Sequence, residues 1–179
     1  MKPPVSELEA DSWAFALDIY ARPGVAEACL SLQREARVDV MMLLVIAFAA
    51  VKLRILPTPA EIRELDKACR PWREQIVWPL RAIRSGLKSG PMPAPNSETE
   101  QFRSKIKTVE LASERLQNQL LVERLPQRPP KPEAVTAEEI HTILGCVVAL
   151  FVEQPANKTD ADLLRSIGKI VDAVMEGVR

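Results

Sequence analysis

The longest apolar run in the chain covers residues 40–51, VMMLLVIAFAAV, and lies between Asp39 and Lys52. It contains no charged, amide or hydroxyl side chain. A helix without a polar side has to be surrounded by other segments on most of its circumference. No stretch alternates polar and apolar residues as a half-buried strand would. We therefore predict an all-α fold, a helix bundle around a central apolar helix at about residues 40–53.

A membrane span is the first alternative to this interpretation. Crossing a bilayer takes about 20 predominantly apolar residues, and the run is shorter than that and has charged residues directly at both ends. The N-terminal sequence MKPPVSELEADSW carries acidic residues where a signal peptide would have its apolar segment. We expect a cytoplasmic protein without a membrane span.

Start and stop signals predict helices on both sides of the central one. The S-x-x-E pattern at 6–9 is typical of a capping box and predicts a helix to about Ala21, which Pro23 ends. A short second helix follows, and Asp39 is the expected N-cap of the central helix. The sequence TPAE at 58–61 predicts the start of the next helix.

Apolar residues recur at helical spacing on both sides of a loop that GLKSGPMPAPN predicts at 86–96. Before the loop, Pro71 either starts a new helix or kinks a continuous one, and Pro79 is an expected kink. After it, SETE at 97–100 predicts a capping box. The spacing then predicts a buried seam typical of lengthwise helix packing, formed by Phe102, Ile106, Val109, Ser113, Leu116 and Leu120.

Proline content divides the chain into three segments. Residues 1–125 form the predicted helical bundle domain, residues 126–135 a proline-rich linker, and residues 136–179 a C-terminal helical hairpin that opens with TAEE. Two helices cannot bury both of their faces alone. The hairpin therefore packs on its own bundle or on another chain, and we expect it to mediate a dimer or a protein contact.

A set of short motifs in a fixed order gives a second source of information. They are WAFAL at 13–17 with Tyr20, PGV at 23–25, CLSLQ at 29–33, Asp39-Val40, PWR at 71–73, PLR at 79–81 with Arg84, and EL with ERL within 110–116. Together they resemble an uncharacterised family of small proteobacterial proteins recorded only as a domain of unknown function, over about residues 13–125. Met41 stands where that family commonly has asparagine. The resemblance implies no catalytic residues.

Charge is balanced overall, with 24 basic and 24 acidic side chains, but it is unevenly distributed. Residues 63–131 carry 14 basic and 8 acidic side chains, and residues 132–179 carry 4 and 8. Either the acidic tail docks on the basic middle, or the middle faces an anionic partner. Zero net charge and a single tyrosine argue against nucleic-acid binding.

The surface most suited to binding a ligand is a row of cations on one predicted helix. Arg81, Arg84 and Lys88 are spaced by 3 and 4 residues, with Arg73 about two turns earlier and Trp78 at the border. Such a row could hold a phosphate, a carboxylate or an acidic partner. The alternative is a solvated basic face that pairs with the acidic tail.

Aromatic residues gather in two predicted helices. Trp13, Phe15 and Tyr20 lie in the first, and Trp72 lies beside Trp78 in another. They could line a pocket for an apolar or amphiphilic ligand, or they could simply pack in the core.

Metal and cofactor chemistry has little support. Cys29, Cys69 and Cys146 are far apart and are expected to be small buried apolar residues. Glu138 and His141 match the Glu-x-x-His spacing of di-iron bundles, but such a site needs a second copy of the motif, and because His141 is the only histidine in the sequence, that copy would have to come from a dimer. We expect no metal and no cofactor.

Two functions follow from these observations. The first is a non-enzymatic interaction or scaffold protein that acts through helical packing of its hairpin. The second is a helical domain that binds a small apolar or anionic ligand, with or without catalysis, between the Trp13 and Trp72 helices, with Arg81 and Arg84 as anion anchors. A closed core near Trp13 would exclude the second. A tightly docked hairpin would count against the first.

Overall fold

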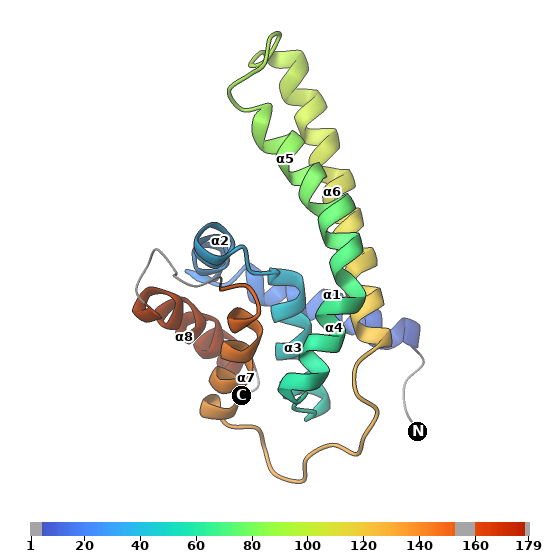
Figure 1. The fold of residues 1–179 in the computed structure, drawn as a ribbon, viewed down its shortest axis with the longest axis vertical. Helices are drawn as coiled ribbons and strands as arrows, with labels where there is room; N and C mark the ends of the chain where they lie inside the picture. Colours follow the sequence, from blue (N-terminus) through green and yellow to red (C-terminus); the bar gives the residue numbers. More distant parts are fainter. Residues whose placement is uncertain (1–4, 153–159, 178–179) are drawn as a thin grey trace.

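The computed structural model describes residues 5–152 and 160–177, and every regular element among them is helical (Figure 1). The predicted all-α class is confirmed. The elements in order are α1 (Val5–Tyr20), α2 (Val25–Ala36), α3 (Val40–Leu53), α4 (Pro59–Trp72), the π-helical turn η1 (Arg73–Val77), α5 (Trp78–Gly86), α6 (Ser97–Glu123), α7 (Ala137–Ala149) and α8 (Asp160–Glu176). Within these described ranges, no helix is long and apolar enough to cross a membrane.

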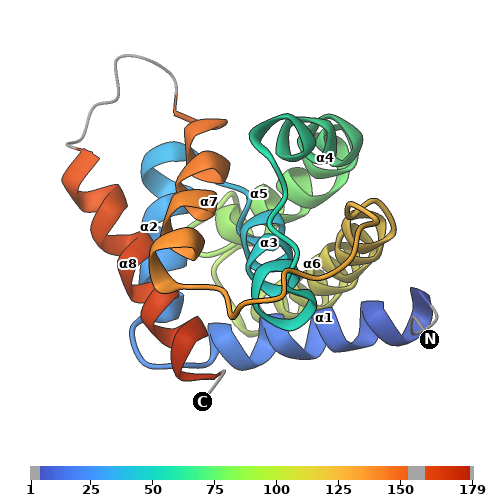
Figure 2. The same cartoon turned by 90° about the horizontal axis from the view of Figure 1, so that it is seen from below.

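Helix α3 contains the apolar run and lies among the other helices (Figure 2). Its residues from Val40 to Ala50 are buried except Met41. It packs against α1, α2, α6, α7 and α8, which is what a helix without a polar side requires. As predicted, Asp39 is its N-cap, and the carboxylate accepts a hydrogen bond from the Met42 amide at 3.1 Å.

The C-terminal helices pack on the bundle of the same chain. Helix α8 lies against α2 and α7, and α7 lies against α3 and α4. One hydrophobic cluster joins buried side chains of α3 to those of the C-terminal helices, which include Ile140, Leu144, Ile167 and Ile170. The structure thus answers the question the sequence left open, because the apolar face of the hairpin is covered within the chain.

The proline-rich segment after α6 is held along the loop between α3 and α4. The Lys131 amide donates to the Arg54 carbonyl at 2.8 Å, and Arg54 Nη1 donates to the Pro132 carbonyl at 3.1 Å. Arg128 forms an ion pair with Glu61 at 2.6 Å. These contacts fix the path that leads from α6 to α7.

Helices α4 and α5 form one continuous rod through the π turn. Pro71 lies inside α4, so it does not start a new helix. The kink predicted at Pro79 is replaced by a π-helical turn just before it, at Arg73–Val77. In this wider turn the Trp78 amide donates to the Arg73 carbonyl. Because Pro79 has no N–H and its ring crowds the preceding turn, a wider turn just before it relieves the conflict.

Most of the predicted helix starts are confirmed, and two are shifted. Thr58 and Thr136 form the expected capping boxes. The N-cap of α6 is Asn96 rather than Ser97, because Asn96 and Thr99 exchange the two reciprocal hydrogen bonds at 2.8 and 2.9 Å. Helix α1 already includes Val5, so Ser6 lies inside it.

The predicted buried seam of α6 is wrong for three of its apolar members, although Ser113 of that seam is buried and Ile106 and Leu120 are partly buried. Phe102, Val109 and Leu116 are each about half exposed, whereas the buried side chains of this helix are mostly polar: Glu110, Ser113, Gln117, Asn118, Leu121 and Val122. The reason is that α6 faces hydrogen-bonding partners instead of an apolar layer. One example is Asn118, whose side-chain oxygen accepts from the Ser12 hydroxyl at 2.8 Å.

Helix α5, residues 87–96 and the first half of α6 project beyond the other helices (Figure 1). We call this antiparallel pair the arm. None of the residues of α5 is buried, so the arm is held largely by contacts between its own two helices.

Candidate functional site

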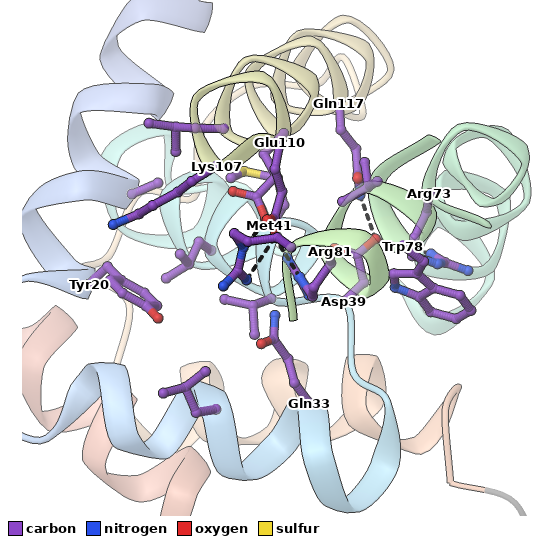
Figure 3. Close-up of a pocket in the computed structure, with 18 of the residues that line it drawn as sticks. Tyr20, Gln33, Asp39, Met41, Arg73, Trp78, Arg81, Lys107, Glu110 and Gln117 are labelled. Carbon is purple, nitrogen blue, oxygen red and sulfur yellow. Dashed lines mark hydrogen bonds and ion pairs between the residues drawn. The ribbon is translucent and has the colours of Figure 1, made fainter. Parts of the chain in front are cut away.

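A cavity of about 560 Å³ opens where the base of the arm meets α1, α2 and the start of α3 (Figure 3). Part of its wall is apolar or aromatic: Trp13, Ala16, Leu17, Tyr20, Leu30, Val40, Met41, Leu44, Val77, Trp78 and Leu111. The remainder is polar or charged: Gln33, Asp39, Arg73, Arg81, Arg84, Ser85, Lys88, Lys107, Glu110, Glu114 and Gln117. Figure 3 shows Arg81 and Glu110 between Tyr20 on one side and Trp78 on the other.

The structure brings most of the sequence-predicted site residues to this one cavity. The predicted cations, which are Arg73, Arg81, Arg84 and Lys88, all line it together with Trp78. Trp13 and Tyr20 of the predicted aromatic wall line it as well.

Phe15 and Trp72 do not line the cavity. Phe15 is buried in the core, where its ring centre lies 5.7 Å from that of Phe48. Trp72 faces α6 and donates its indole N–H to the Ser113 carbonyl at 3.0 Å. Phe15 follows Trp13 by two residues, about 200° around a helix, so the two side chains point to opposite sides of α1.

A buried charge cluster forms one end of the cavity. Arg73 is only 2% exposed, and its Nη1 lies 3.1 Å from Asp39 Oδ2 and 2.9 Å from Asp66 Oδ1. Gln117 also donates to Asp39. Burial alone would lower the pKa of Arg73, but the carboxylates outweigh it and raise that pKa. The guanidinium is therefore a fixed positive charge in this wall.

Two guanidinium groups lie over the indole of Trp78. The Arg37 guanidinium is 4.5 Å from the ring centre and that of Arg73 is 5.4 Å away. Arg73 also lies 4.9 Å from the Phe151 ring. Such cation–π contacts orient both partners. They therefore fix the orientation of the Trp78 indole in the cavity wall.

A second charge cluster crosses the base of the arm. Glu110 accepts from Arg81 Nε at 2.9 Å and from both Nε and Nη2 of Arg84, the latter at 3.2 Å. Glu114, one turn later, accepts from Arg81 Nη2. These partners lie on α6, so the sequence alternative in which the basic row pairs with the acidic tail is wrong for Arg81 and Arg84.

The two carboxyls of this cluster differ in acidity. Burial would raise the pKa of Glu110, but hydrogen bonds from Arg84 and Arg81 outweigh it and lower that pKa. For Glu114 burial outweighs the single partner Arg81, and its pKa is raised. Burial also raises the pKa of Tyr20, and the nearby Cys29 and Glu114 add to this effect. Adjacent groups with divergent pKa values are typical of functional sites.

Sequence reasoning missed the contribution of α6 to the cavity. Lys107, Glu110, Glu114 and Gln117 all line it. They are spaced by 3, 4 and 3 residues, which is a polar stripe at helical spacing. That stripe was readable from the sequence, but it lies about 100° around the helix from the apolar seam, and the prediction assigned the buried side to the seam.

The three cysteines are free, with Cys29 and Cys69 buried and Cys146 partly exposed. Burial raises the pKa of both Cys29 and Cys69 to about 12, so neither thiol is poised as a nucleophile. Over the described ranges, no group of three histidine, cysteine or acidic side chains is arranged to hold a metal ion.

The part of the chain that forms this cavity matches a known protein family. Residues 11–121 match the family described as "Protein of unknown function (DUF2390)", and every residue that lines the cavity falls inside that range. No curated protein and no solved structure matches the chain. The resemblance to a domain of unknown function is thus confirmed, and because the match covers more than half of its length, the chain belongs to this family.

Proposed function

We propose that the chain binds a small amphiphilic anion in the cavity at the base of the arm. The observation that carries the proposal is the open space of about 560 Å³ between an aromatic wall and a row of fixed cations. Small-molecule sites have volumes of about 300–1,000 Å³ and combine apolar walls with a few placed polar groups.

The charge of the cavity favours an anion. Its wall contains five basic side chains and three acidic ones, namely Arg73, Arg81, Arg84, Lys88 and Lys107 against Asp39, Glu110 and Glu114. The arginines are held in place by carboxylates, so little side-chain entropy is lost when a ligand arrives. Lys88 and Lys107 are exposed and add positive charge where a ligand enters.

The apolar part of the wall favours an amphiphile over a simple inorganic anion. Four large apolar side chains that are exposed to solvent line the cavity, namely Leu17, Tyr20, Leu30 and Leu111. Covering such surface is favourable by about 25 cal/mol per Å². A ligand with an apolar body would cover them and leave its charged end against the arginines.

Decanoate provides a direct test, with decanol and decylamine as matched compounds that lack the negative charge. Isothermal titration of the purified protein is expected to show decanoate binding more tightly than either compound. Failure of decanoate to bind, or equal binding of all three, would contradict the proposal.

A pair of leucine variants locates the binding site. Leu30 is 52% exposed in the cavity wall, and Leu164 is 48% exposed on α8, outside the cavity. L30D is expected to weaken decanoate binding at least tenfold, which is about 1.4 kcal/mol, while L164D leaves it unchanged. Equal effects of the two variants would place the binding elsewhere.

A second candidate, the non-enzymatic interaction protein, is favoured by the surface of the arm. Most large apolar side chains of α7 and α8 are packed in the core of the same chain over the described residues, but Ile83, Met92, Phe102 and Val109 of the arm are exposed. For this second candidate function the partner is a second copy of the chain. Two of these two-helix arms side by side would form a four-helix bundle. F102E is then expected to convert a dimer to a monomer in sedimentation velocity, with L164E as the control.

The cytoplasm is the proposed location for either function. Cys29, Cys69 and Cys146 are all free, which fits a reducing compartment. Retention of the protein with the cytosolic fraction after cell fractionation is the expected result.

A further inference from the structure

We propose that Glu114 occupies the position of the ligand's charged group, so that a carboxylate of the ligand replaces the Glu114 carboxylate on Arg81. This inference rests on the proposed function and narrows the ligand class to amphiphilic carboxylates. It also makes Glu114 the residue that sets how tightly the cavity holds an anion.

The two carboxylates in the cavity wall are held unequally. Glu110 is bound by both Arg81 and Arg84, and its side chain is 7% exposed. Glu114 is bound by Arg81, and its side chain is 21% exposed. A ligand that competes for an arginine in this cavity displaces the more weakly held partner, which is Glu114.

The two hydrogen bonds of Arg81 to carboxylates have different roles in the proposed exchange. Its Nε bonds to Glu110, which keeps the guanidinium oriented, while its Nη2 bonds to Glu114. A charge-assisted hydrogen bond from Nη2 to a new carboxylate replaces one of the same kind and similar strength. The displaced group is itself a carboxylate, so the position fits the size and planarity of that group.

Displacement would leave Glu114 without its arginine, in a wall that disfavours its charge. Burial already raises the pKa of Glu114 despite Arg81, and a ligand carboxylate on Arg81 would add a like charge nearby. Glu114 therefore takes up a proton from solvent as the ligand binds. The titratable and charged groups around Glu114 belong to α1, the N-cap of α3, α5 and α6. They are Tyr20, Asp39, Arg81, Arg84, Lys107 and Glu110.

Proton uptake gives a measurement on the unaltered protein. Titration of decanoate at pH 7 in buffers of different ionisation enthalpy is expected to show protons taken up on binding. Affinity is expected to fall as pH rises above the range in which decanoate itself ionises, because ionised Glu114 competes for Arg81 at higher pH. Binding without proton uptake and without this pH dependence would overturn the inference.

Variants separate the exchange from a general change in charge. E114Q is expected to bind decanoate at least tenfold more tightly at pH 8 and to lose the proton uptake. E123Q, which makes the same charge change at an exposed position of α6 outside the cavity, should behave as wild type. Decanol, which needs no arginine, should bind E114Q and wild type equally.

The outcomes distinguish this inference from the proposed function. If decanoate binds wild type and L30D weakens it, but E114Q binds no more tightly than wild type, the role of Glu114 is refuted and the binding function stands. If neither wild type nor E114Q binds decanoate, the binding function itself fails. A thermal melt of E114Q checks that the variant is folded.

Discussion

Arg73 Nη1 lies 3.1 Å from Oδ2 of Asp39, and the other carboxylate oxygen of Asp39 accepts from the Met42 amide. The residue that caps the most apolar helix of the protein is therefore also the partner of a buried guanidinium. Helix α3 has no polar atom in its side chains before Lys52, yet its N-cap places it at the cavity wall. Asp39 thus belongs both to the start of the core helix and to the cavity wall.

Removal of this carboxylate should be costly. D39A leaves Arg73 with one fewer partner, and breaking a buried ion pair costs about 3 to 5 kcal/mol. D39N keeps the N-cap acceptor, which is worth about 1 kcal/mol, so it should be less destabilised than D39A by about that amount. Urea denaturation measures both differences. Equal stability of the two variants would mean that the cap contributes nothing.

Two glutamates one turn apart should have opposite effects on stability. The pKa of Glu110 is lowered on folding and that of Glu114 is raised. At pH 7, E110Q is therefore expected to lower the free energy of unfolding by about 1 to 3 kcal/mol, whereas E114Q leaves it unchanged or raises it. Urea denaturation of both variants checks the signs.

The pH dependence of these effects follows from the same shifts. A depressed carboxyl pKa stabilises the fold above the unfolded value, about 4.3 for glutamate, and this contribution is lost as pH falls through the folded pKa. The cost of E110Q should therefore disappear below that range. Any gain from E114Q is expected in full above the raised pKa of Glu114 and should vanish as pH falls toward the unfolded value of about 4.3. A pH-independent difference would contradict both assignments.

Helix α6 should tolerate polar residues along its apolar stripe. V109Q and L116Q replace side chains that are about half exposed, so each should change stability by less than about 0.5 kcal/mol. L121A removes a buried side chain and is expected to cost about 2 to 5 kcal/mol. Chemical denaturation would contradict the described packing if the polar variants were as destabilising as L121A.

The C-terminal helices should be required for folding. A chain that ends at residue 135 would uncover the core side chains that α7 and α8 bury, among them Leu144 and Ile167. We expect it to lose cooperative thermal unfolding and to bind a hydrophobic dye. Unfolding at the same midpoint as the full chain would show instead that residues 1–135 form an independent domain.

The cysteines should differ in reactivity toward a thiol reagent. Cys29 and Cys69 are buried with pKa values raised to about 12, so they should react only after unfolding. Cys146 is partly exposed and should be modified first in the native protein. Mass spectrometry of peptides after brief labelling identifies the order, and early modification of Cys69 would mean that the buried charge cluster opens readily.

Much of the fold was readable from the sequence because it depends on local signals. The apolar run of α3 and the caps at Asp39, Thr58 and Thr136 each act through residues within one or two turns. The candidate cations were also found, since Arg81 and Arg84 share one side of a short helix. What a helix faces is not a local property, however.

The errors came from assigning partners to helix faces. The apolar side of α6 suggested a buried seam, but Glu110 and Gln117, which lie on the adjoining side of the helix, have partners far away in the chain at Arg84 and Asp39. Only the tertiary arrangement supplies those partners. The same limit applies to Trp72, since spacing alone does not tell whether an indole faces a cavity or the neighbouring helix.

The π turn sets the rotational phase of the rod that carries the arginines. In a regular α-helix, eight residues turn about 800°, so Arg81 would stand about 80° away from Arg73 around the axis. A π turn adds one residue to a single turn, and eight residues then complete about two full rotations. The widened turn at Arg73–Val77 thus aligns Arg73 with Arg81 along one side of the rod, and deleting one residue there would rotate Arg81 and Arg84 out of the cavity together.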